Sequence, residues 1–403
     1  MSENINSNLI TVTEAESLIL AEGRNYGEEK VSIDQSLNRI LAKAIVADRD
    51  FPPFDRVTMD GIAIKFTSFQ NGNRQFKIQS TQVAGDEKQT LLLDNECIEV
   101  MTGTILPSNT DSVIRYEALK IESGFATILE EVKSNQNIHF QGEDRKKGEI
   151  IVQPNQLITA AEMAIAASVG AHELSIKKLP QIAIITSGNE LVPIETVPEL
   201  HQIRRSNSYA IASLLAKYEI EAAKIHIDDH LEETIKSIEK ALVENDVLIL
   251  SGGVSMGKKD FIPKALESLG FEKLFHKIAQ TPGKPFWFGK KGEKLVFALP
   301  GNPVSTYLCT IRYIIPWLCK SLEMREIKIE QAQLSEDFEI KNNLTYFLQV
   351  KLFQENATTF AQPIKGHGSG DFANLVDADA FMELPTFERN EFKKGEVFRI
   401  WRL

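Results

Sequence analysis

Apolar and polar positions follow three successive patterns along this 403-residue chain. The first is helical. Apolar residues recur at helix spacing after Thr13, and Glu16 three positions on completes a capping box, so we predict that a helix begins there. Residues 32–47 continue this helical part, and the two prolines of the FPPFDR segment that follows force extended backbone and mark a domain boundary.

Residues 62–140 carry short β-rich runs separated by Gly, Asn, Asp and Ser, which is typical of a small β-domain. An alanine-rich helical stretch follows and stops at Gly170, and it is more like the N-terminal part than like the β-runs before it. We therefore predict a helical linking domain in two pieces, residues 1–46 and 145–177. A β-domain, residues 47–144, is inserted between the two pieces.

From Pro180 onward strand and helix patterns alternate, and several strands are almost wholly apolar. Such strands are buried on both faces, which favours a parallel sheet with helices on each side. We predict that residues 178–324 form this central α/β domain. Residues 325–403 return to short β-runs and are expected to form a small C-terminal β-barrel-like domain. The predicted fold class is therefore multidomain, α/β plus β.

Composition narrows the classes of function. Hydrophobic residues make up 43% and charged residues 25% of the chain, as in globular proteins, and the net charge of −11 disfavours binding to nucleic acid or anionic membrane. No apolar run is long enough to cross a bilayer, and no secretory signal is visible at the N-terminus. Cys97, Cys309 and Cys319 have neither metal-site nor disulfide-framework spacing. We expect a cytoplasmic protein.

Three glycine-rich loops follow predicted strands of the central domain: residues 186–190, 251–257 and 300–303. Glycine lets the backbone approach a ligand closely, and the N-terminus of the next helix attracts an anion. Because ligands of open α/β sheets bind at the carboxyl ends of the strands, the three loops together predict a site for a small, phosphate-bearing anion. Ordinary strand-to-helix turns also use glycine, so each loop alone predicts little.

One of these loops has the spacing of a nucleotide-binding P-loop. Residues 252–258 fit G-x-x-x-x-G-K, but the next residue is Lys259, where that motif needs Ser or Thr to hold magnesium. This departure disfavours a P-loop nucleotide hydrolase. Binding of a phosphate by the backbone amides of the same loop is still compatible with the sequence.

Acidic residues gather at the same predicted strand ends. Glu190, Asp228, Asp229 and Asp260 lie at strand ends or in the loops after them, and carboxylates that converge there suit Mg²⁺. The alternative is that the aspartates only cap the helices that follow. Which of Asp228 and Asp229 points inward depends on one residue of register.

Beyond these general patterns, a set of specific motifs resembles one family. The segments are MDGIAI from Met59, MTGTILP from Met101, GED at 142–144, TSGNEL, SNSY, SGGVSMGKKD, TPGKP from Thr281 and ALPGNPVS. In this order and spacing they are similar to the MoeA/gephyrin E-domain family of molybdopterin molybdenumtransferases, over essentially the whole chain.

The resemblance implies a function and an assembly. It implies a MoaB/Mog-like central domain and insertion of molybdenum from molybdate into adenylylated molybdopterin, with release of AMP and with Mg²⁺ as cofactor. It also implies a homodimer whose cleft lies between the α/β domain of one protomer and the β-insert of the other. An upstream molybdopterin adenylyltransferase and molybdoenzymes are the further partners that it implies.

The resemblance also implies site residues. The catalytic set is Asp60, Thr102, Glu190, Asp229 and Asp260. The last three of these would hold the metal. The cofactor-binding set is Asp144, Ser187, Gly188, Ser206, Ser208, Gly252, Gly253, Ser255, Lys277, Gly283, Lys284, Pro300, Gly301, Asn302 and Ser305. Without the resemblance, Asp60-Gly61 is a common hairpin dipeptide and Thr102-Gly103 an ordinary turn.

The chain departs from the family at several basic positions. His139, Phe140 and Gln141 stand where the family carries an arginine run, and Thr281 replaces a basic residue before Pro-Gly-Lys-Pro. Cations are gained in nearby loops, at Arg145, Lys146, Lys147, Arg204, Arg205, Lys258 and Lys259. We hypothesise that the cleft keeps its positive potential by relocating it; the alternative is that these are solvated surface residues.

Three functions therefore compete. The first is an active molybdenum insertase, favoured by the retained acidic set. The second is a catalytically weakened paralogue that binds molybdopterin as a carrier or scaffold, favoured by the lost arginines. The third and weakest is a magnesium-dependent nucleotide hydrolase, which rests on the P-loop-like spacing alone.

Overall fold

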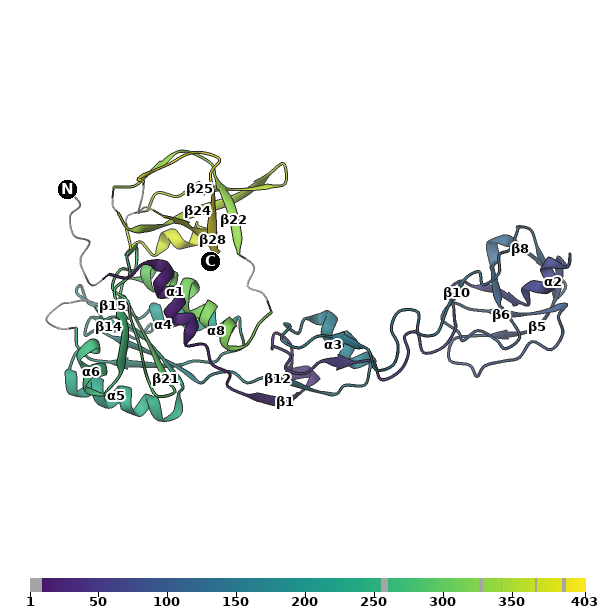
Figure 1. Cartoon of the computed structure of the whole chain (residues 1–403), viewed down its shortest axis with the longest axis horizontal. Helices are drawn as coiled ribbons and strands as arrows, with labels where there is room; N and C mark the ends of the chain where they lie inside the picture. Colours follow the sequence, from purple (N-terminus) through teal and green to yellow (C-terminus); the bar gives the residue numbers. More distant parts are fainter. Residues whose placement is uncertain (1–8, 255–259, 326–328, 342, 367, 386–388) are drawn as a thin grey trace.

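The computed structural model describes residues 9–254, 260–325, 329–341, 343–366, 368–385 and 389–403. Figure 1 shows an elongated molecule: a central body with the C-terminal domain beside it, a slender linking part, and the β-insert at the far end. None of the helices in these ranges is long and apolar enough to cross a membrane.

A six-stranded sheet forms the middle of the central body. Its strands, in spatial order, are β16 (Ala223–Ile227), β13 (Ile182–Ser187), β17 (Val247–Ser251), β21 (Lys294–Leu299), β20 (Trp287–Lys291) and β18 (Glu272–His276). The first four are parallel, as predicted, whereas β20 runs antiparallel to both of its neighbours, β21 and β18, so the sheet is mixed. The tight turn at Gly292 joins β20 to β21 as a hairpin, and a hairpin can only be antiparallel.

Helices cover both faces of this sheet. One face packs α1 (Val12–Ala21), α4 (Asn207–Ala216), α7 (Pro303–Cys309) and α8 (Ile315–Ser321), and the other packs α5 (Leu231–Glu244) and α6 (Ile262–Ser268). Along β17, Ile249 faces the first layer and Leu250 the second, and both are fully buried. This two-sided burial explains why the strand is apolar at every position before Ser251.

Helix α1 begins earlier than the sequence predicted. Its N-cap is Thr11, whose amide and hydroxyl both donate to Glu14, at 2.7 and 2.9 Å. The predicted capping box of Thr13 and Glu16 is therefore wrong by two residues, because Glu16 instead pairs with a buried arginine described below.

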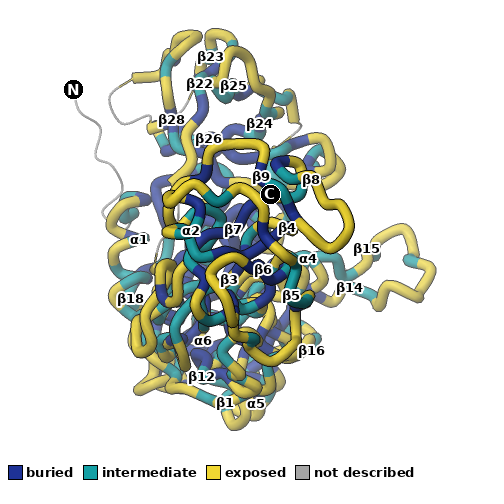
Figure 2. The backbone as a smooth tube through the Cα atoms, turned by 90° about the vertical axis from the view of Figure 1, so that its right-hand side faces the viewer, coloured by how far each residue is buried: buried dark blue, intermediate teal, exposed yellow. Residues whose placement is uncertain are grey.

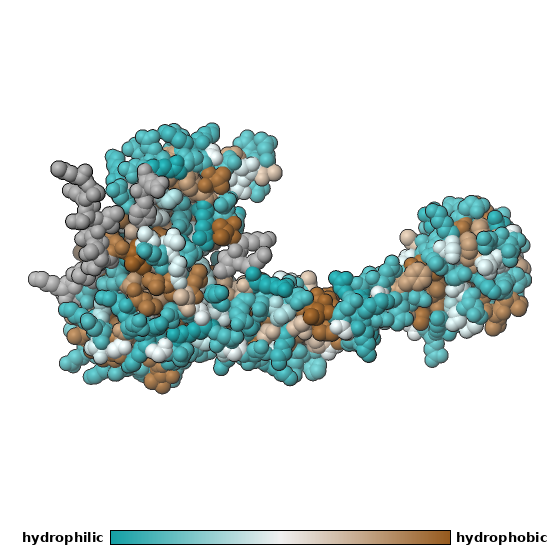
Figure 3. All heavy atoms as spheres, in the orientation of Figure 1, coloured by the Kyte–Doolittle hydropathy of each residue, from teal (hydrophilic) through white to brown (hydrophobic). Residues whose placement is uncertain are grey.

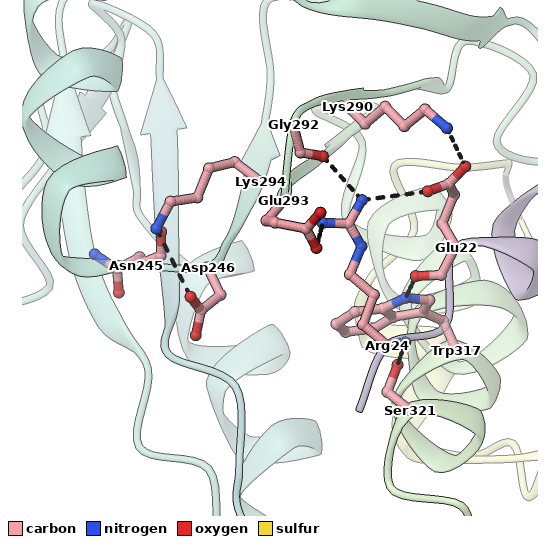
Figure 4. Close-up of polar contacts among 10 residues, drawn as sticks. All are labelled: Glu22, Arg24, Asn245, Asp246, Lys290, Gly292, Glu293, Lys294, Trp317 and Ser321. Atoms are coloured by element: carbon pink, nitrogen blue, oxygen red, sulfur yellow. Dashed lines mark hydrogen bonds and ion pairs between the residues drawn. The ribbon is translucent and has the colours of Figure 1, made fainter. Parts of the chain in front are cut away.

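The end of α1 is fastened to the β20–β21 hairpin where the chain leaves the central body (Figure 4). Arg24 donates to Glu293 at 2.8 Å and to Glu22 at 3.3 Å, and Lys290 donates to Glu22 at 2.6 Å. The indole of Trp317 on α8 donates to the backbone oxygen of Glu22 at 3.1 Å. These contacts hold the base of the linking part against the central sheet.

The linking part contains less helix than the sequence pattern suggested. Its helix is α3 (Ala160–Ser168), and its strands pair as β1 (Glu28–Ser32) with β12 (Glu173–Lys177) and β2 (Ile45–Val46) with β11 (Ile150–Val152). Residues 32–47 form a short 3-10 turn, η1 (Ile33–Gln35), then a turn at residues 37–38 where Asn38 has a φ of 61°, and end in the short strand β2. Leu41 and Ile45 are buried there against Ile158 and Ile176, and this packing overrides the local helical spacing.

The β-insert is built on one six-stranded sheet in the order β7-β4-β6-β5-β9-β8. The bounds are β4 (Gly61–Ile64), β5 (Gln75–Gln82), β6 (Glu96–Val100), β7 (Ser112–Arg115), β8 (Leu119–Glu122) and β9 (Phe125–Ile128). Beside it lie α2 (Phe66–Gln70), η2 (Tyr116–Ala118) and the pair β3 (Arg56–Val57) with β10 (Ile138–His139).

The C-terminal domain is a small closed sheet. Its strands are β22 (Glu330–Leu334), β24 (Thr345–Glu355), β25 (Thr358–Pro363), β26 (Ala380–Leu384) and β28 (Val397–Arg402), and the β24–β26 pairing closes it. Strands β23 (Phe338–Glu339) and β27 (Glu391–Phe392) pair beside it, and η4 (Ala373–Val376) follows residue 372. A central-domain strand, β19 (Gln280–Thr281), adds to β24 in parallel, so the two domains share backbone hydrogen bonds.

An arginine buried between these two domains joins three parts of the chain. Arg312 lies in a π-helical turn, Thr310–Ile314, between α7 and α8, and its side chain is 1% exposed. It donates to Glu16 of α1 at 2.9 Å and to Glu383 of β26 at 3.0 Å, and it lies over the ring of Trp401. A buried charge is tolerated only when it is paired, so this cluster requires all three parts to be in place.

We predict that Glu383→Gln lowers the free energy of unfolding by about 1.5–3 kcal/mol, because Arg312 then keeps only one charged partner. The matched control is Glu391→Gln in the same domain, whose partner Lys393 lies at 3.3 Å on the exposed surface. Thermal and urea unfolding of both variants measures the difference. Equal midpoints for the two variants would contradict a structural role for the buried cluster.

Candidate functional site

The three glycine-rich loops meet at the carboxyl edge of the central sheet. They enclose a cavity of about 380 Å³. The loop after β13 contributes Ser187, Gly188 and Glu190, the loop after β17 contributes Gly252 and Gly253, and the loop after β21 contributes Gly301. The remaining lining residues are Thr186, Leu191, Ile203, Arg204, Arg205, Ser206, Asn207, Asp229, Ser251, Val254, Asp260, Asn302 and Pro303.

Glycine is required where two of these loops touch. Gly252 has a φ of 96°, and a Cβ atom there would lie 2.6 Å from the carbonyl oxygen of Ser187. Gly253 follows with a φ of 62°. Both conformations suit glycine, and the contact leaves no room for a side chain at position 252. The backbone of one loop therefore forms the wall of the next.

Three carboxylates face this cavity, those of Glu190, Asp229 and Asp260. The hydroxyl of Ser187 donates to Asp229 at 2.6 Å, and the Asp229 amide donates to Asn189 at 2.9 Å, so this aspartate is held in place. Asp228 does not line the cavity; its side chain is 59% exposed and lies 3.7 Å from His226. The structure thus selects Asp229 over Asp228 as the inner carboxylate.

The donor set of the cavity suits one kind of metal site and not another. Within the described ranges, no three His, Cys, Asp or Glu side chains lie together closely enough to hold a metal ion by themselves. Mg²⁺, however, commonly binds through one or two carboxylates and completes its shell with ligand phosphates and water. The cavity carboxylates fit Mg²⁺ bound together with a phosphate ligand.

A second cavity, of about 330 Å³, lies between the central and C-terminal domains. The predicted site residues that line it are Gly283, Lys284, Pro300, Asn302 and Ser305. Asn302 lines both cavities and donates to Ser369 of the C-terminal domain at 2.7 Å. The predicted cofactor-binding residues that line a cavity are therefore divided between two adjoining cavities.

The loop that carries Lys284 is held from within the domain. Gln280 is fully buried, accepts a hydrogen bond from Tyr313 in the π-helical turn, and donates to the backbone oxygen of Pro282 at 3.1 Å. Burial raises the pKa of Tyr313 well above its ordinary value, so Tyr313 remains a hydrogen-bond donor at neutral pH.

The predicted residues of the β-insert lie apart from both cavities of their own chain. Asp60 accepts hydrogen bonds from the amide and the hydroxyl of Thr102, at 2.6 and 2.8 Å, and these bonds lower the pKa of Asp60. Asp144 lies 3.0 Å from a ring nitrogen of His139. Figure 1 shows the β-insert separated from the central body by the linking part.

Three further predicted residues are placed differently from the rest. Ser208 is buried in α4 and Lys277 follows β18 with a φ of 124°, and neither lines either of these two cavities. Ser255 lies outside the described residues, as do Lys258 and Lys259.

Asn207 is a site residue that the sequence analysis missed. Its side-chain amide donates to the backbone oxygen of Gly301 at 2.8 Å and to the hydroxyl of Ser251 at 2.9 Å. Helix α4 thereby ties the loops after β17 and β21 together. The SNSY motif contained this residue, but nothing in its spacing distinguished Asn207 from the serines on either side.

Comparison with known proteins gives matches along the whole chain. Residues 10–170 match the MoeA N-terminal region (domain I and II), residues 183–320 a probable molybdopterin binding domain, and residues 331–403 the MoeA C-terminal region (domain IV).

Two relatives and one solved structure also match along nearly the full length of the chain. The chain is 37% identical to the molybdopterin molybdenumtransferase of Synechocystis sp., over 97% of this chain and 99% of the relative. It is 32% identical to that of Staphylococcus aureus, over 98% and 95%. The molybdopterin biosynthesis MoeA protein of Pyrococcus horikoshii OT3 aligns over 98% of this chain and 100% of its own, with a TM-score of 0.84 and 27% identity.

We predict that Gly252→Ala damages the cavity more than the fold as a whole. The control is Gly270→Ala, because Gly270 also has a positive φ, 76°, but has open space around it. Gly270→Ala is expected to cost about 1–2 kcal/mol of stability through backbone strain alone. Gly252→Ala should cost at least about 1 kcal/mol more and abolish AMP binding, measured by calorimetry. Unchanged AMP binding in Gly252→Ala would contradict this description of the cavity wall.

Proposed function

Because the chain belongs to the MoeA family of molybdopterin molybdenumtransferases, we propose that it inserts molybdenum from molybdate into adenylylated molybdopterin and releases AMP. The observation that carries this proposal is the 37% identity to a molybdopterin molybdenumtransferase along the full length of both chains. The cavity adds support, because backbone amides and acidic side chains face the same space, as a phosphate-bearing ligand and a cation require. An adenylyltransferase that supplies the substrate and molybdoenzymes that receive the product would be the partners.

The chain's own residues would orient the substrate. The glycine-rich loops present amides to the anionic groups of the ligand, and Lys284 adds a cation from the second cavity. Asp229, held by the Ser187 hydroxyl, and Glu190 and Asp260 would hold Mg²⁺. When bound, Mg²⁺ supplies positive charge that offsets the charge of the phosphate oxygens.

We further propose that the protein works as a homodimer with a composite site. Within one chain, Asp60 and Thr102 line neither cavity, so they reach a site only if a second copy brings them there. The linking part also exposes large apolar side chains, among them Leu37, Val46, Ile150 and Leu157. Figure 3 shows hydrophobic surface on the linking part and the β-insert, which a second copy would cover.

The carrier or scaffold function remains the second candidate. His139 and Gln141, which stand in the place of arginines, contact carboxylates of the β-insert itself, His139 that of Asp144 at 3.0 Å and Gln141 that of Asp50 at 3.1 Å. Loss of bidentate arginine contacts weakens oxyanion binding. A carrier would therefore bind molybdopterin but lack catalytic turnover.

The decisive assay supplies adenylylated molybdopterin, molybdate and Mg²⁺ and follows AMP release and bound molybdenum. We expect both to appear, to cease with a chelator and to return with added Mg²⁺. Tight binding without AMP or molybdenum incorporation would support the carrier. Hydrolysis of plain ATP would support the nucleotide hydrolase.

A subunit-mixing experiment tests the composite site. Asp60→Asn and Asp260→Asn should each abolish AMP release as homodimers. A purified heterodimer that carries one variant in each subunit contains one intact site, so about half of the wild-type activity should return. If the heterodimer stays inactive while both homodimers fold normally, Asp60 and Asp260 do not belong to one site shared between subunits.

A further inference from the structure

A shallow apolar hollow adjoins the main cavity at Arg205. It is lined by Ile194, Tyr209, Ala210, Ser213 and Phe372 together with three residues that also line the cavity, Arg204, Arg205 and Ser206. The hollow therefore combines the arm after β13, helix α4 and the C-terminal domain, and a ligand in the cavity can extend into it past Arg205.

The arm that supplies one wall is the segment of residues 188–206, which connects β13 to α4. It contains β14 (Leu191–Val192) and β15 (Ile203–Arg204), which pair in parallel, and it projects from the body with much of its surface exposed (Figure 2). The Arg205 amide donates to the backbone oxygen of Val192 at 3.0 Å, which fixes where its side chain begins.

Arg205 has a buried donor that no described residue satisfies. Its Nε atom is buried and makes no hydrogen bond in the described part of the chain. The neighbouring Arg204 is different, because its Nε donates to the backbone oxygen of Thr196 at 3.1 Å. An unsatisfied buried donor of a guanidinium is costly, and an anionic oxygen in the adjoining cavity would remove that cost.

Arg205 rather than a histidine supplies the positive charge at this edge of the cavity. Burial, followed by the charge of Arg205, lowers the pKa of His226, which is therefore neutral at pH 7. A planar guanidinium with several donors binds a phosphate group better than the carboxamide of a glutamine or the neutral imidazole of a histidine does.

The hollow beyond Arg205 suits a flat, apolar group. As residues, Tyr209 is 41% exposed, with Lys224 Nζ 4.6 Å from the centroid of its ring, and Phe372 is 36% exposed, so the hollow offers aromatic surface for contact. A phosphate site next to exposed aromatic surface is the arrangement that a nucleotide needs, since its base stacks and its phosphate is bound by charge-assisted hydrogen bonds.

We propose that Arg205 binds the phosphate of the AMP half of the substrate and that the base lies in the hollow against Tyr209 and Phe372. This inference rests on the proposed function, because that function supplies a nucleotide as part of the substrate. Arg205 would thus determine affinity for the adenylyl group, and the released AMP would occupy the same place.

Calorimetric titration with three probes separates the two contacts: AMP, ribose 5-phosphate and adenosine. Arg205→Gln should weaken AMP and ribose 5-phosphate about ten-fold to a hundred-fold, the loss expected for hydrogen bonds to a charged group. Arg205→Lys should recover part of this loss, since it keeps the charge without the planar fork. The control Lys217→Gln removes one positive charge at the other end of α4, away from the cavity, and should change affinity less than two-fold.

Tyr209→Ala tests the proposed contact between the base and Tyr209. It should weaken AMP and adenosine several-fold and leave ribose 5-phosphate unchanged, because only the first two probes carry the ring. Thermal unfolding of each variant shows whether the fold is kept. If AMP does not bind, if Arg205→Gln binds AMP like the unaltered protein, or if Tyr209→Ala weakens all three probes equally, the proposal is overturned.

The molybdate-dependent assay of the unaltered protein distinguishes a failure of the role of Arg205 from a failure of the insertase function. Molybdenum incorporation with AMP release, together with normal AMP binding by Arg205→Gln, would overturn the role of Arg205 alone. Absence of incorporation would overturn the insertase function, whatever the Arg205 variants bind.

Discussion

Strands β13 and β17 run parallel and in register, with Thr186 opposite Ser251, and β21 continues the same alignment with Leu299 opposite Ser251. The chain therefore leaves all three strands at one edge, where successive loops must pass within contact distance. At that edge the carbonyl oxygen of Ser187 lies where a side chain at position 252 would be. This crowding brings the amides, the carboxylates and the start of α4 to one cavity, and the choice of this cavity as the ligand site depends on it.

The parts of the fold that follow from burial alone were predictable. Strand β17 is apolar at successive positions because both faces of the sheet are covered, and several such runs, alternating with helical patterns, indicated a parallel central sheet. The start of α1 was not predictable, since Thr11 and Thr13 each have a glutamate three residues on. Only the position of Arg312, some 300 residues later in the chain, decides that Glu16 serves the domain junction and not the cap.

The sequence predicted where the site lies in the fold but not all of the side chains that form it. Glycine at strand ends identified the edge of the sheet, but the choice between Asp228 and Asp229 required the register of the loop that Asn189 holds. Asn207 was missed because its role is to bridge two loops that are distant in sequence, and no local pattern records such a bridge. Asp60 and Thr102 form a local pair within the β-insert, so in the proposed dimer their contribution to a site would depend on assembly and not on the fold of one chain.

The hypothesis that positive charge has been relocated can be placed on the structure. Of the positions where the resemblance implies a lost basic residue, His139, Phe140 and Gln141 lie in the β-insert and Thr281 in β19 of the central domain, and Lys146 lies 3.5 Å from the backbone oxygen of Gln141. Arg205 instead lines the cavity of the central domain with a donor left unsatisfied. In a composite dimer site both segments would face the same ligand from opposite sides. The positive charge would then have moved from the wall that the partner supplies to the wall that the chain supplies itself, which makes phosphate binding less dependent on how tightly the two copies close.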